Sequence, residues 1–133
     1  MEEIKTVFPK GGKNTAYEKY FTGTSYLQML TAGAELGLPI GHVTFEPGCR
    51  NHWHAHPGGQ ILLVTGGTGW YQEEGKEARK LIAGDIVEIP RGVKHWHGAA
   101  KDSWFAHLSI EADISAGPSC WYEEVTDEEY NAL

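Results

Sequence analysis

Short apolar segments alternate with turn-forming residues along most of the chain. These segments are rich in β-branched and aromatic residues, which favours strands over helices. They are YLQML (26–30), HVTFEPG (42–48), QILLVTGG (60–67), GWYQEEGKEARKLIAGD (69–85), DIVEIPRG (85–92) and WFAHLSIE (104–111). Glycine and proline mark the loops between them, at Pro47-Gly48, Pro57-Gly58-Gly59, Gly66-Gly67 and Pro90-Arg91-Gly92. Many short strands separated in this way predict an all-β sandwich or barrel.

Two segments have helical character. Residues 16–21 (AYEKYF) predict a single turn, and residues 125–133 (VTDEEYNAL) predict a short closing helix, because Thr126 and Glu129 have the spacing of a capping box. A chain of 133 residues has the size of one domain. We therefore expect a single domain over 1–133, with the barrel core at about 22–112 and the tail and helix at about 118–133.

Composition and charge argue against several classes of partner. The net charge is −7 and no basic stripe is present, which argues against nucleic acid. No apolar run is long enough to cross a bilayer, and the start MEEIKTVF lacks the features of a secretory signal. The two cysteines, Cys49 and Cys120, match neither a disulfide framework nor a zinc spacing. We expect a soluble cytoplasmic protein that acts on a small molecule.

Five of the seven histidines stand at alternating positions in two segments, His52, His54 and His56 in the first, and His95 and His97 in the second. Alternating residues of a strand point to one face, so each group is expected to converge. Neutral imidazoles in this arrangement suit a divalent transition metal. The alternative is ordinary hydrogen-bonded histidines at the core edge, but the occurrence of both groups in one small domain favours metal binding.

The spacing around these histidines resembles the two motifs of the cupins, which are small β-barrel proteins. The first motif is matched by Gly48, His54, His56, Gln60 and Gly67, and the second by Gly84, Pro90, Gly92 and His95. The resemblance implies an all-β cupin barrel, a double-stranded β-helix of the jelly-roll type. It also implies that His54, His56, Gln60 and His95 bind one divalent metal ion per chain. His52 has no counterpart in the motif, and we expect it at the pocket rim or on the surface.

A narrower resemblance covers nearly the whole chain from Phe21 onward. Segments such as HPGGQ, KHWHGAA and VTDEEY are similar to a subgroup that includes bacterial manganese-dependent hydroxynitrile lyases and cupins associated with carboxymuconolactone decarboxylases. The resemblance implies manganese and a homodimer. The mixed nitrogen and oxygen ligands leave iron, nickel, zinc and cobalt open.

Gln60 stands where the cupin motif has a glutamate, so the expected ligands carry no negative charge. The full charge of a divalent ion would then attract an oxyanion or a carboxylate and favour Lewis acid chemistry. Leu62 and Val64 share the face of Gln60 and are expected to line the pocket. Trp70, Trp104 and Trp121 are expected to anchor the core or an interface.

His107 and His97 are the candidate catalytic residues. Phe105, His107 and Ser109 share one strand face, and a histidine near a metal in a barrel is a suitable general base. The hydroxynitrile-lyase-like resemblance supports His107 over His97, which could instead act as an acid or base or contact a metal ligand. The alternative for His107 is a structural histidine in the core.

Together with these residues, the resemblance implies a metal-dependent lyase that acts on a small hydroxy or carbonyl compound, as hydroxynitrile lyases do. The metal would act as the Lewis acid and a pocket histidine as the base. Two other functions remain open, an oxygen-dependent cupin dioxygenase and a non-enzymatic cupin that binds a small anion.

Overall fold

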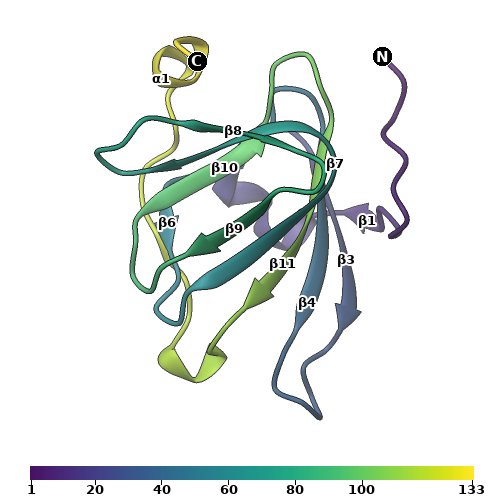
Figure 1. Cartoon of the computed structure of the whole chain (residues 1–133), viewed down its shortest axis with the longest axis vertical. Helices are drawn as coiled ribbons and strands as arrows, with labels where there is room; N and C mark the ends of the chain where they lie inside the picture. Colours follow the sequence, from purple (N-terminus) through teal and green to yellow (C-terminus); the bar gives the residue numbers. More distant parts are fainter.

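The computed structural model describes residues 1–133, and it consists mainly of strands (Figure 1). The first six strands are β1 (Gly12–Lys13), β2 (Phe21–Thr22), β3 (Ser25–Thr31), β4 (Ile40–Phe45), β5 (Arg50–Asn51) and β6 (His54–Ala55). The next six are β7 (Gln60–Glu73), β8 (Arg79–Ile82), β9 (Ile86–Ile89), β10 (His95–Ala99), β11 (Phe105–Glu111) and β12 (Cys120–Trp121). Two 3₁₀ helices, η1 (Thr15–Tyr20) and η2 (Ile114–Ala116), and the α-helix α1 (Asp127–Asn131) complete the chain.

The twelve strands form one curled sheet, in which the main order is β1-β3-β4-β11-β7-β10-β5-β2. β7 is the longest strand and belongs to both halves of this sheet. Residues 60–67 of β7 pair with β11 on one side, and residues 69–73 pair with β10. All pairings are antiparallel, so the result is the predicted all-β barrel with a short C-terminal helix (Figure 1).

The predicted loop at Gly66-Gly67 is wrong, because β7 continues through both residues. Gly67 has a φ of +71°, which glycine adopts without strain. A Cβ atom at this position would overlap the carbonyl oxygen of Trp104. Glycine therefore allows β7 to bend from one half of the sheet to the other without ending the strand.

The hydrophobic core fills part of the barrel interior. Its largest fully buried members are Phe45, Phe105, Leu62 and Leu81. The prediction that Leu62 and Val64 line a pocket is wrong, since both pack into this core. Residues on the same face as Gln60 reach different depths of the barrel, and the deeper positions are filled by apolar side chains.

The C-terminal segment runs back along the barrel, where β12 pairs with β6 (Figure 1). The predicted capping box is confirmed, because the Thr126 and Glu129 side chains each bind the other residue's backbone N–H. Arg50 anchors the helix through hydrogen bonds to the Val125 carbonyl and the Asp127 carboxylate, 2.9 and 2.7 Å long. Its guanidinium also lies 4.3 Å from the centre of the Tyr130 ring. None of the helices is long and apolar enough to cross a membrane.

Candidate metal centre

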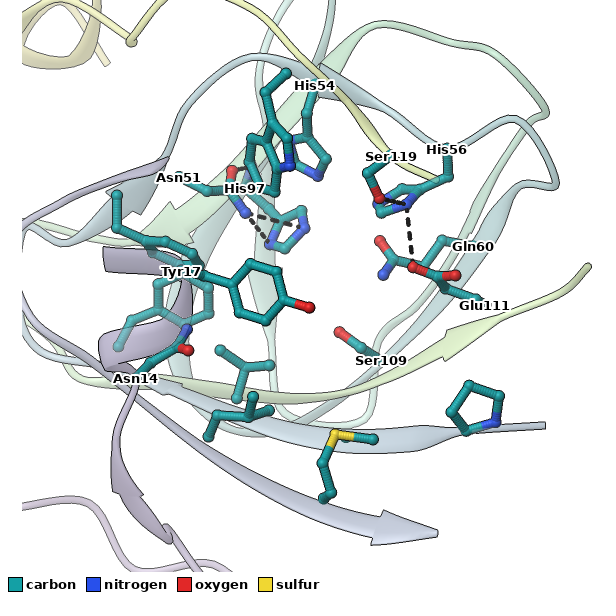
Figure 2. A pocket seen from close by; sticks show the side chains of 18 residues that line it. Asn14, Tyr17, Asn51, His54, His56, Gln60, His97, Ser109, Glu111 and Ser119 are labelled. Atoms are coloured by element: carbon teal, nitrogen blue, oxygen red, sulfur yellow. Dashed lines mark hydrogen bonds and ion pairs between the residues drawn. The ribbon is translucent and has the colours of Figure 1, made fainter. Parts of the chain in front are cut away.

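A cavity of about 330 Å³ lies beside the core. Its wall is apolar where β3 and β4 contribute Leu27, Met29, Val43 and Phe45. The opposite wall is polar, and its side chains come from five strands, from the residue that follows β6 and from the C-terminal segment (Figure 2). They are Asn51, His54, His56, Gln60, His97, Ser109, Glu111 and Ser119.

Two histidines face each other across a pair of strands. The antiparallel register places His54 of β6 opposite His95 of β10, and their ring centres are 4.2 Å apart. His54 Nδ1 donates to the carbonyl of His52 at 2.8 Å, and His95 Nδ1 donates to the carbonyl of Val93 at 2.9 Å. A histidine that donates from Nδ1 keeps Nε2 free to bind a metal, and its ring is held in orientation.

His56 follows β6 and is held in the same way by side chains. Its Nδ1 lies 2.9 Å from Ser119 Oγ and 3.5 Å from Glu111 Oε1 (Figure 2). The Nε2 atoms of His56 and His95 and the Oε1 atom of Gln60 are buried without a hydrogen-bond partner. Such atoms are rare because leaving them unpaired is costly. Imidazole nitrogens and an amide oxygen fit a divalent transition metal ion.

A second histidine grouping overlaps the first. One ring nitrogen each of His54, His95 and His97 can be chosen so that all three atoms lie within 4.8 Å of one another. These three residues could therefore hold a metal ion. The His97 ring, however, already has polar neighbours. The amide nitrogen of Asn51 lies 3.3 Å from both of its ring nitrogens, and His107 Nε2 lies 3.2 Å from its Nδ1. His54 and His95 belong to both possible ligand sets.

His107 is fully buried and does not line the cavity. The rings of Phe45 and Phe105 pack against it, with centres 5.4 and 5.6 Å from its own. Its Nε2 contacts His97 Nδ1, and its Nδ1 lies 3.3 Å from Ser109 Oγ. Because His97 and Ser109 both line the cavity, His107 reaches the cavity only through these two residues.

Burial governs the charge of these histidines. It lowers the pKa of His54 and of His97 well below the usual value, and neighbouring histidines add to the effect. It lowers the pKa of His95 to about 4 and that of His107 to about 3. All four rings are therefore neutral at pH 7, which is the state that binds metals and accepts protons.

The remaining histidines lie outside the cavity. His52 does not line it, and only its carbonyl takes part by accepting from His54. His42 is buried on the other face of β4, where its ring nitrogens lie 3.1 Å from the Pro9 carbonyl and 2.8 Å from Thr65 Oγ1. Strand alternation predicts this separation, since Val43 and Phe45 face the cavity.

Several cavity residues have no counterpart among the predicted site residues. They are Tyr17, Asn51, Ser109, Glu111, Ser119 and Trp121. Trp121, expected to anchor the core or an interface, stacks on His54 at 4.6 Å and lines the cavity as well. Strand alternation from His107 could have indicated Ser109 and Glu111. Nothing local marks Ser119 or Trp121, which reach the site through the pairing of β12 with β6.

The chain is similar to known proteins over most of its length. A family profile described as cupin domain matches residues 41–110. An (R)-mandelonitrile lyase from Granulicella tundricola is 44% identical over 130 residues, which cover 96% of this chain and 98% of the relative.

Solved structures give the same picture of the fold. A cupin-like protein from Thermotoga maritima superimposes with a TM-score of 0.90 and is 46% identical, with 96% of each chain covered. A DMSP lyase from Ruegeria pomeroyi superimposes with a TM-score of 0.66 at 21% identity, covering 92% of this chain and 63% of that one. At that identity the second likeness concerns the fold alone.

Proposed function

The chain belongs to the cupin family, and from this premise we propose that it is a metal-dependent lyase that cleaves or forms a carbon–carbon bond beside a hydroxyl group. The observation that carries the proposal is the set of buried, unpaired acceptor atoms on His56, Gln60 and His95 beside a small cavity. The similarity to a mandelonitrile lyase supports hydroxynitriles as the first substrates to test.

We assign the metal ligands to His54, His56, Gln60 and His95. Three of these residues carry the unpaired atoms, and His54 lies opposite His95 with its Nδ1 already bonded. His97 is left out because Asn51 and His107 already contact its ring. A bound divalent ion would supply Lewis acidity toward a substrate oxygen. The family resemblance favours manganese.

His97 is the base that the cavity offers to a substrate. A His97 ring that donates from Nδ1 to His107 Nε2 keeps Nε2 as its proton acceptor, and His107 can donate in turn from Nδ1 to Ser109 Oγ. With Nδ1 donating to His107, the amide N–H of Asn51 can donate only to Nε2, so a substrate hydroxyl takes the place of Asn51 at this nitrogen. In contrast to the sequence-based preference for His107, we therefore assign the direct role to His97 and a supporting role to His107.

The proposed reaction is the cleavage of a hydroxynitrile to a carbonyl compound and hydrogen cyanide, with His97 carrying the proton. His97 takes the proton of the substrate hydroxyl, the carbon–oxygen bond becomes a carbonyl, and the bond between that carbon and the nitrile carbon breaks. The electron pair of the broken bond leaves with cyanide, which then takes the proton from His97. The apolar wall formed by Leu27, Met29 and Val43 suits the hydrocarbon part of a small aldehyde or ketone.

The test compares manganese-loaded wild type with His54→Ala for release of benzaldehyde from mandelonitrile. We expect turnover in the wild type and a rate at buffer background in the variant, which loses a metal ligand. Elemental analysis of the two preparations should show one metal ion per wild-type chain and less in the variant. Identical background rates for the two proteins would mean that the protein is not a hydroxynitrile lyase.

Two further measurements distinguish the alternative functions, a dioxygenase and a non-enzymatic binding protein, from a lyase. Oxygen consumption with candidate diols or diketones would indicate a dioxygenase, since a lyase needs no oxidant. Retention of an unchanged small anion without turnover would indicate a binding protein.

A further inference from the structure

Glu111 is the one charged side chain that lines the cavity. It is the last residue of β11, and the strand register pairs it directly with Gln60 of β7. Its carboxylate points to the imidazole of His56, with 3.5 Å between Oε1 and Nδ1 (Figure 2). The negative charge of Glu111 therefore lies on the strand next to β7, directly beside Gln60, the proposed neutral ligand.

This contact differs from an ordinary surface ion pair. His56 is 93% buried and Glu111 is half-buried, with 38% of its side chain exposed. Glu111 has no ion pair with a lysine or arginine, and Arg91 lies 4.0 Å from Asp113 instead. No lysine or arginine lines the cavity, and His56 is the one side chain within ion-pair distance of the Glu111 carboxylate.

A carboxylate that accepts from Nδ1 of a metal-binding histidine has two effects. It orients the ring and makes Nε2 a stronger donor to the metal. It also places a negative charge near a cation whose ligands are all neutral, which reduces the net charge of the site. Ser119 Oγ, at 2.9 Å, orients the ring as well but brings no charge.

We propose that Glu111 sets the charge of this site: it strengthens binding of the divalent ion through His56, and it repels anionic ligands from the cavity. The inference rests on the ligand assignment made under the proposed function. It revises the sequence-based expectation of a site that attracts carboxylates, because Glu111 restores the charge that Gln60 lacks. The substrate class is then neutral hydroxy and carbonyl compounds.

The test uses Glu111→Gln, which keeps the shape of the side chain and removes its charge. The matched control is Glu88→Gln, which makes the same charge change at an exposed position of β9, a strand that also pairs with β7. The dissociation constant of Mn²⁺ is measured by competition with a chelator. We expect it to rise roughly 10- to 100-fold in Glu111→Gln and to stay at the wild-type value in Glu88→Gln.

The second arm measures binding of mandelate, an anion, and of benzyl alcohol, a neutral compound, to the manganese-saturated proteins. We expect Glu111→Gln to bind mandelate about tenfold more tightly than wild type, with benzyl alcohol unchanged. Glu111→Asp keeps the charge and should bind mandelate as weakly as wild type, which separates charge from any loss of folding.

Equal Mn²⁺ affinities in wild type and Glu111→Gln, or equal mandelate affinities, would overturn this inference. Neither measurement depends on turnover. A wild type that binds Mn²⁺ but leaves mandelonitrile intact would therefore count against the lyase proposal and not against Glu111.

Discussion

Three residues, Ser109, His107 and His97, connect two points of the cavity wall by hydrogen bonds through the core. His107 has no access of its own to the cavity, so its effect on a substrate must pass through His97 or Ser109. A neighbour of this kind fixes which nitrogen of the catalytic ring carries the proton. In the proposed reaction, His97 therefore contacts the substrate, whereas His107 positions the His97 ring.

His107→Gln should lower kcat for mandelonitrile by roughly 10- to 100-fold, because His97 loses the partner that fixes its tautomer. The metal content should stay at the wild-type value, since His107 is not a proposed ligand. Steady-state kinetics and elemental analysis of the same preparation check both expectations. His42→Gln is the control, because His42 is equally buried but lies outside the cavity. A similar loss of kcat in both variants would argue for a general packing effect.

Among the strands, β7 connects the two halves of the sheet, because it pairs with four other strands. It starts at the site with Gln60, pairs with β11 and β9 through its first half, and then pairs with β10 and β8. The bend at Gly67 allows one strand to serve both halves of the sheet. It brings β10, with His95 and His97, into position beside the residues of β11.

Gly67→Ala should destabilise the protein by about 2–4 kcal/mol, from the positive φ and the overlap with Trp104 together. Gly75→Ala is the matched control, because Gly75 has a φ of +80° but no atom within 4 Å of an added Cβ. We expect the control to cost about 1 kcal/mol. Urea unfolding measures both values. Equal losses would show that the contact with Trp104 adds nothing to the backbone strain.

For the whole molecule, the main electrostatic feature is the burial of neutral histidines in a chain of net charge −7. Burial lowers the pKa of His42, His54, His95, His97 and His107 below the usual 6.5. The unfolded chain therefore binds more protons than the folded chain between these lowered values and pH 6.5. Acid favours unfolding over that range, and the folded state is most stable above it.

The metal-free protein should lose stability as the pH falls below about 6.5. His95 and His107, whose pKa values are about 4 and about 3, each contribute about 1.4 kcal/mol per pH unit over this range. Thermal unfolding of chelator-treated protein between pH 7.5 and pH 5, at roughly half-unit steps, measures the slope. His42→Gln should show a shallower slope because it removes one buried histidine. A Tm that is independent of pH would contradict the burial of these rings in their neutral form.

Much of the fold was predictable because its signals are local. Apolar runs, glycines and prolines indicated the strands and turns, and the Thr126 and Glu129 spacing indicated the closing helix. Of the motif residues, His54, His56 and Gln60 line the cavity, and His95 lies opposite His54 on the neighbouring strand. The sequence predicted a loop at Gly66-Gly67, because two consecutive glycines commonly end a strand. In the structure they form a bend, and β7 continues through both residues.

The sequence by itself determined the barrel class, because strand alternation and turn residues act over a few positions, and its resemblance to the cupin motifs implied the candidate metal-binding residues. Only the tertiary structure decided that His107 lies behind His97 and that Glu111, Ser119 and Trp121 join the site. Those contacts depend on the register between distant strands and on how deeply the core fills the barrel. Both are properties of long-range packing, which no short stretch of sequence specifies.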